Sequence, residues 1–162
     1  MSGFNLERKD EGSKIVVSLS GRIDEDATFF ELDFVGKTQI VLDMEKVASI
    51  NSCGIREWIK WVRTVPGEST ITYRNCPKVI VDQVNMVAGF LPENGTVESF
   101  YVPYYCEKSD TEKTVLFRKG IEFKDDGEIV PPSGVKCDES GEEMEMDIIT
   151  SKYFKFLQKG HN

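Results

Sequence analysis

The chain has 162 residues, a formal net charge of −8 at pH 7 and 30% charged side chains. Its hydrophobic fraction of 40% indicates a globular protein with a packed core and excludes a disordered or fibrous chain. The negative charge would repel the phosphates of nucleic acids and anionic lipid surfaces, so neither is an expected partner.

The first twelve residues form a polar segment (1–12) without the apolar stretch of a secretory signal. No run of about 18 apolar residues follows, so membrane insertion is not expected. The chain holds four cysteines. In a chain without a signal peptide they indicate free thiols in a reducing cytoplasm more than a disulfide framework.

The next elements in the chain are strands. Residues 14–20 are rich in β-branched side chains and end at Gly21, which predicts a strand and a turn. Residues 39–44 contain the run 40–42, which is apolar on both faces and predicts a central strand covered on both sides of a sheet. Residues 24–35, between these strands, are expected to form a short helix or an irregular crossover.

An amphipathic helix is predicted from Ile55 to Val65, where the apolar residues follow helical spacing until Pro66. On this helix Trp58 and Trp61 are expected to pack in the core, as aromatic residues on an apolar face usually do.

A strand over residues 69–74 comes next, and Pro77 then begins a second helix. The apolar stripe of this helix runs from Ile80 to Leu91, and residues 97–105 return as an aromatic strand. The alternation predicts an α/β fold, with a sheet of about four to five strands covered by amphipathic helices.

Composition changes after Tyr105, and residues 106–162 are expected to form a small β-rich appendage. It contains short strand-like runs and turn-forming dipeptides. We expect its aromatic tail, residues 153–157, to dock on the rest of the protein. His161, the only histidine, lies next to the C-terminal residue, where neither a ligand nor a catalytic base is expected.

Residues 41–55 join the buried strand to the helix through a short polar turn. Asn51 and Ser52 can accept hydrogen bonds from amides of the first helical turn, and Gly54 leaves the turn uncrowded. The free amides and the helix dipole would tolerate an anion here. The turn is therefore a candidate binding surface, consisting of Asn51, Ser52, Cys53, Gly54 and Ile55.

This segment resembles the STAS domains, which are typified by bacterial anti-sigma-factor antagonists. Their strand of the form V-L-D-x-x-x-V and their turn D-S-S-G-L are matched here by residues 41–47 and 51–55, and the similarity covers residues 13–105. The resemblance implies a STAS-like domain that binds a protein partner in bacterial signalling, such as an anti-sigma-type kinase or another sensory protein.

The resemblance also implies a regulatory serine that a partner kinase phosphorylates. In this chain Cys53 occupies the position of that serine, and Asn51 replaces the usual acidic residue. Ser52 could carry the phosphate instead, although a capping role is commoner for such a serine. Cys53 at a helix start is a candidate redox-sensitive thiol, although a small packed residue is the commoner role of cysteine.

The appendage resembles a degenerate zinc ribbon. Cys106 and Ser109 form one knuckle-like turn, and Cys137 and Ser140 form the other. With serine at half of the ligand positions, we expect a vestigial site that holds no metal, because neutral hydroxyls are poor zinc ligands. Cys106 and Cys137 should still lie near each other.

No nucleophile, metal-protease, phosphate-loop or dinucleotide motif is present, so no enzymatic activity and no cofactor are expected. The leading hypothesis is a non-enzymatic protein-binding module. The alternatives are a sensor of a nucleotide or lipid and, as a weaker one, a structural subunit that docks through the appendage.

Overall fold

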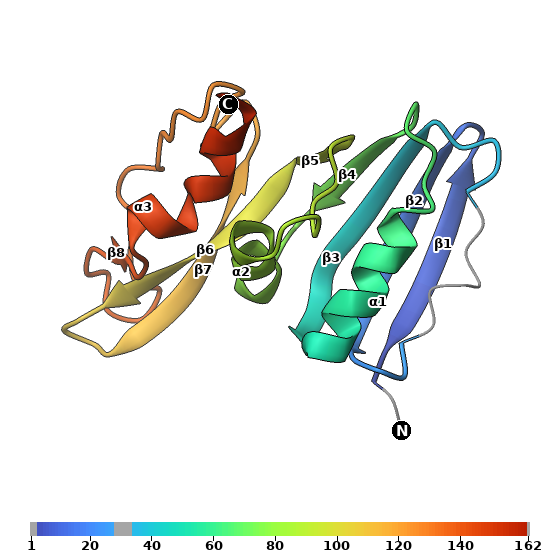
Figure 1. Ribbon diagram of the computed structural model, residues 1–162. Coiled ribbons are helices and arrows are strands. Elements are labelled where there is room, and N and C mark those ends of the chain that lie inside the picture. Colours follow the sequence, from blue (N-terminus) through green and yellow to red (C-terminus); the bar gives the residue numbers. More distant parts are fainter. Residues whose placement is uncertain (1–2, 28–33, 162) are drawn as a thin grey trace.

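The computed structural model describes residues 3–27 and 34–161. They form a mixed α/β fold of two sheets that lie side by side (Figure 1). The first sheet contains β1 (Asn5–Glu11), β2 (Lys14–Ile23), β3 (Gln39–Ile50), β4 (Thr70–Arg74) and β5 (Gly95–Val97). The second contains β6 (Ser99–Cys106), β7 (Thr111–Arg118) and β8 (Glu145–Met146). The helices are α1 (Ser52–Val62), α2 (Lys78–Met86), α3 (Thr150–Tyr153) and the 3-10 helix η1 (Lys155–His161).

The first sheet has the order β1-β2-β3-β4-β5, with β3 at its centre as predicted. β2 to β5 run parallel, and β1 is antiparallel to β2. β1 lies in the segment that had been expected only to be polar. It escaped prediction because it is an edge strand whose side chains are exposed, apart from half-buried Leu6, so it has no apolar alternation.

β3 continues to Ile50, beyond the predicted end at Met44. Its pairing register with β2 shifts twice, and the amide of Glu45 turns to donate to Asp43 Oδ1 at 3.1 Å. Such irregularities break the alternation that identifies a strand in the sequence. The run 40–42 is buried as expected, but Asp43 is half-buried and Glu45 is exposed. The part of β3 that is covered on both faces of the sheet therefore ends at Leu42.

α1 lies across one face of the first sheet and buries Trp58 and Trp61, as predicted. The Trp58 indole N–H donates to the Tyr73 hydroxyl at 2.9 Å, and this hydroxyl donates to the Phe90 carbonyl. The Trp58 ring also stacks on Phe90 with centroids 5.3 Å apart. A hydrogen-bonded aromatic cluster therefore joins α1, β4 and the segment after α2.

α2 ends at Met86, so the prediction that it continues to Leu91 is wrong. Val87 is extended and Gly89 has φ +87°, which turns the chain back. Phe90 can then reach the core, where it is completely buried. Burial of this ring outweighs continuation of the apolar helical stripe.

The predicted strand over residues 97–105 is two strands in different sheets. β5 ends at Val97, and the Glu98 amide donates to the Tyr73 carbonyl at 2.8 Å. β6 then begins at Ser99 and pairs with β7 and β8. The sequence predicts that residues 99–105 belong to the STAS-like domain over 13–105. In the structure these residues pair with strands of the appendage.

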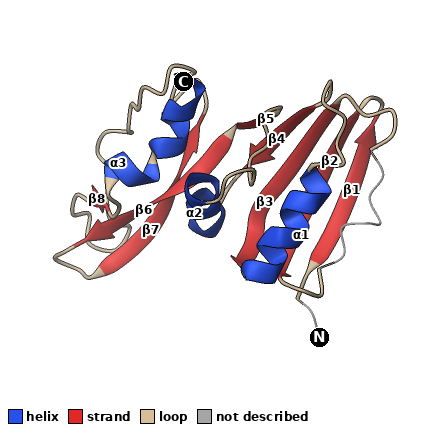
Figure 2. Ribbon diagram, in the orientation of Figure 1, coloured by secondary structure: helices blue, strands red, loops and turns tan. Residues whose placement is uncertain are grey.

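The second sheet lies beside the first, with α3 next to it (Figure 2). Phe100 on β6 is fully buried in the core of this part of the protein. The C-terminal tail docks here as expected, and Tyr153, Phe154 and Phe156 are buried against this ring. The buried hydrophobic residues of both sheets, apart from Val41, belong to one hydrophobic cluster. The two sheets therefore share a core.

Two further expectations concern the crossover over residues 24–35 and insertion into a membrane. The predicted crossover over 24–35 falls partly on residues 28–33, which lie outside the described residues. Phe34, which follows them, is buried and lies 5.6 Å from Trp61 between ring centroids. In the described ranges no helix has the length and apolar character needed to cross a membrane.

Candidate functional site

The candidate site is the turn formed by residues 51–55, between the end of β3 and the start of α1. Asn51 is the N-cap residue, with φ −105° and ψ 179°. Its side-chain Oδ1 accepts from the Gly54 amide at 2.8 Å, and its carbonyl accepts from the Ile55 amide at 2.9 Å. Asn51 thus performs the capping role expected from the sequence.

Asn51 also binds the turn to the end of β2. Its amide donates to the Ile23 carbonyl at 3.1 Å, and its Nδ2 donates to Glu25 Oε2 at 3.1 Å. Glu25's own amide, and then Asn51, lower the pKa of the Glu25 carboxyl group. A carboxylate of the protein therefore lies beside the positive end of α1. Sequence reasoning missed Glu25 because parallel strand pairing, not sequence proximity, brings it here.

Gly54 is buried against the backbone of β2. A Cβ at this position would lie 2.1 Å from the Ile23 carbonyl oxygen and 2.6 Å from its carbon. Real Cβ atoms essentially never show such distances, so only glycine fits without movement of the helix or the strand.

The remaining residues of the turn differ in exposure. Ser52 is exposed, whereas Cys53 and Ile55 are half-buried. Cys76, Cys106 and Cys137 are buried instead, and all four cysteines are free. Cys53 is therefore the cysteine with the most accessible position, directly beside the exposed hydroxyl of Ser52.

The outward face of α1 is basic. Ser52, Arg56, Lys60 and Arg63 are exposed and recur at helical spacing, with half-buried Ile59 among them. Lys60 contacts Glu57 at 3.4 Å, but Arg56 and Arg63 form no ion pair with any described residue. We call these residues the α1 outer face: Ser52, Arg56, Ile59, Lys60 and Arg63. Their spacing could have revealed this face in the sequence.

The structure brings the two knuckle-like turns of the appendage together. Ser109 Oγ lies 3.6 Å from Cys137 Sγ, and Thr111 Oγ1 lies 3.1 Å from the same sulfur. Ser109 also hydrogen-bonds to Cys106, and Ser140 hydrogen-bonds to Cys137. Sequence reasoning missed Thr111, which lies on β7 outside the knuckle pattern.

These hydroxyl groups change the acidity of the two thiols. The Thr111 hydroxyl, followed by Ser140 and Ser109, lowers the pKa of Cys137 to about 6. Hydrogen bonds from Ser109 likewise lower the pKa of Cys106. In the described part of the chain, no group of three or more His, Cys, Asp or Glu side chains could hold a metal ion. Two thiols with neutral hydroxyls do not fit a zinc-ribbon site.

Cys76 and His161 are two further residues whose side chains could react or bind a ligand. Cys76 is completely buried, and this burial raises the pKa of its thiol. The side chain of His161 lies outside the described residues.

No protein-family model and no curated protein matches the chain. Its function must therefore be inferred from the geometry and chemistry of its own residues.

Proposed function

We propose that this chain is a non-enzymatic STAS-like signalling module that binds a partner protein through the 51–55 turn and the α1 outer face. The observation that carries the proposal is the positive charge of Arg56 and Arg63, which form no ion pair with a described residue, on a chain of net charge −8. Such a face attracts an acidic surface on a partner and orients it during encounter.

The position of the turn supports this proposal. Residues 41–47, which resemble the STAS strand, lie on β3, and residues 51–55 follow at its carboxyl end and begin α1. The hydrogen bonds of Asn51 and the close contact of Gly54 with Ile23 hold the start of the helix firmly on the sheet. A rigid turn presents Ser52 to a partner with little loss of conformational entropy on binding.

Ser52 is also the residue at which the proposed surface would be regulated by phosphorylation. It stands four positions before Arg56 on the α1 outer face, so a phosphate on Ser52 would reduce the positive charge offered to the partner. The carboxylate of Glu25, bound to Asn51, would add to the negative charge there. Phosphorylation would therefore weaken binding of an acidic partner.

The test is recovery of partners by the tagged full-length chain from a native bacterial extract, followed by mass spectrometry. We expect Arg56→Glu/Arg63→Glu and the bulky Cys53→Trp to lose partners that the wild type recovers. Lys136→Glu is the matched control, because Lys136 is exposed and unpaired in the described structure but lies in the appendage. Identical partners from all variants, with circular dichroism unchanged, would refute the proposed surface.

Salt provides a second measurement once a partner is identified. Exposed ion pairs are screened by salt, so the Kd of the complex should rise as ionic strength increases. For Arg56→Glu/Arg63→Glu this dependence should be smaller. A Kd that is independent of salt would contradict an electrostatic role for the α1 outer face.

A hollow between α2 and β5 on one side and the appendage on the other favours a second candidate function, a small-molecule sensor. Its volume is about 410 Å³, and its walls include Val84 from α2 and Phe123 and Phe156 from the appendage. Lys119 and Lys124 also line it. Apolar walls with a few charged groups are typical of ligand sites. Thermal-shift assays with nucleotides and fatty acids would test this function, and no shift with any of them would count against it.

A further inference from the structure

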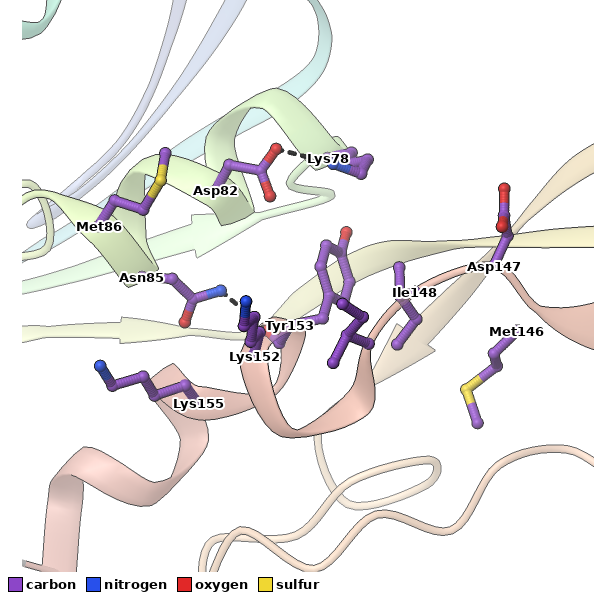
Figure 3. A pocket seen from close by; sticks show the side chains of 11 residues that line it. Lys78, Asp82, Asn85, Met86, Met146, Asp147, Ile148, Lys152, Tyr153 and Lys155 are labelled. Carbon is purple, nitrogen blue, oxygen red and sulfur yellow. Dashed lines mark hydrogen bonds and ion pairs between the residues drawn. The ribbon is translucent and has the colours of Figure 1, made fainter.

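A second hollow, with a volume of about 740 Å³, lies between α2 and the segment that runs from β8 through α3 to η1 (Figure 3). One wall consists of α2 side chains, and the other consists of side chains from residues 146–155. We call this hollow the α2/α3 groove. It shares no residue with the 51–55 turn or with the α1 outer face.

Hydrogen bonds hold the two walls of the groove together. Asn85 Nδ2 donates to the Tyr153 carbonyl at 2.9 Å, and Asn85 Oδ1 accepts from the Phe156 amide at 2.8 Å. The Tyr153 hydroxyl donates to the Tyr101 carbonyl on β6 at 2.6 Å. α2, α3 and β6 are therefore linked, and the groove is formed before any ligand binds.

Large apolar side chains are exposed on both walls. Met86 on α2 is 71% exposed, and Ile149, just before α3, is 63% exposed. Half-buried Met146 and Ile148 continue the apolar lining. Exposed apolar side chains gathered around one hollow mark an interaction site, and methionine adapts its shape to different ligands.

Positive and negative side chains are unevenly distributed along the groove. Lys152 and Lys155 are exposed and form no ion pair with a described residue, whereas Lys78 pairs with Asp82 at 2.9 Å. Asp147 lies at the far end from Lys155 (Figure 3). The surplus positive charge thus lies at the Lys155 end of the groove, beside the exposed apolar side chains.

We propose that the α2/α3 groove binds an amphipathic helical segment of a partner protein that carries apolar residues and Asp or Glu. The apolar face would cover Met86 and Ile149, and the acidic residues would contact Lys152 and Lys155. A nucleic acid would meet Asp82 and Asp147, and a second copy of this chain would bring another net charge of −8. An acidic amphipathic segment fits both the apolar lining and the two lysines that form no ion pair within the described residues.

The test uses a phage-displayed random peptide library selected on the immobilised full-length chain. We expect the enriched peptides to combine large apolar residues with Asp or Glu at helical spacing. The most enriched peptide, labelled with fluorescein, would then be titrated by fluorescence anisotropy. Ile149→Asp and Lys152→Glu/Lys155→Glu should each weaken its binding by about tenfold or more.

Matched variants separate the groove from general surface effects. Ile121→Asp changes an isoleucine that is 54% exposed, and Lys136→Glu changes a lysine that forms no ion pair with a described residue. Both lie elsewhere in the appendage and should leave binding unchanged. Arg56→Glu/Arg63→Glu should also leave it unchanged, because this groove is independent of the α1 outer face. Circular dichroism would show that each variant is folded.

Several results would overturn the proposal. These are no enriched peptide, enrichment of basic peptides, unchanged binding by the groove variants, or an equal loss in the matched variants. Tighter binding of dodecanoate than of any peptide would assign the groove to fatty acids instead. A dimer seen by light scattering and abolished by Ile149→Asp would assign it to a second copy of the chain.

Discussion

Replacement of Gly54 by alanine tests how the turn is held on the sheet. The added Cβ would lie 2.1 Å from the carbonyl oxygen of buried Ile23, which is a backbone atom of β2 and cannot rotate away. The start of α1 would have to move outward. This movement would also strain the hydrogen bond from the Gly54 amide to Asn51 Oδ1, now 2.8 Å long.

Two contributions set the size of the effect. Overpacking in a core costs about 1–3 kcal/mol, and loss of one hydrogen bond costs about 1 kcal/mol. We therefore expect Gly54→Ala to lower the free energy of unfolding by about 2–4 kcal/mol, a large share of the roughly 5–15 kcal/mol of a typical domain. With an m-value of about 2 kcal/mol/M, the urea midpoint should fall by about 1–2 M.

Equilibrium unfolding in urea measures this loss, and fluorescence of the buried Trp58 and Trp61 reports the transition. Gly67→Ala is the matched control, because a Cβ at Gly67 meets nothing within 4 Å. Its stability should change by no more than about 1 kcal/mol. If Gly54→Ala unfolds at the same urea concentration as the wild type, the described contact between α1 and β2 is wrong.

Three further variants test other interactions. Asn51→Ala should cost about 1 kcal/mol in urea unfolding because the Gly54 amide loses its acceptor. Asn51→Ser should retain more of the stability, because its hydroxyl can still accept from the Gly54 amide and the change places no second carboxylate beside Glu25; equal losses would argue against the cap. Tyr73→Phe removes the buried hydroxyl between Trp58 and the Phe90 carbonyl and should cost about 1–3 kcal/mol; unchanged stability would show that this hydroxyl is dispensable. The pKa of Cys137 is lowered from 9.0 to about 6, so its thiolate should stabilise the fold fully above pH 9, and this contribution should be lost as pH falls towards 6. Cys137→Ala should reduce the change in urea midpoint between these pH values, and an unchanged pH profile would contradict the proposed thiolate.

Elements with regular burial were predictable from the sequence. β2 alternates between buried and more exposed residues over 15–19, and α1 buries Trp58, Trp61 and Val62 on one face. Edge strand β1 and the end of α2 were not predictable in this way. β1 buries too little to show a pattern, and α2 ends where Phe90 turns into the core.

The candidate sites also contain some contacts between residues near each other in the chain and others between distant segments. Capping by Asn51 and the spacing of Ser52, Arg56 and Lys60 depend on residues close in the chain, so the sequence alone determined them. The contacts of Gly54 with Ile23 and of Asn51 with Glu25, and the hydrogen bond of Thr111 with Cys137, join distant segments. Only the tertiary structure decided these contacts and the α2/α3 groove, because strand pairing and core packing set which distant side chains meet.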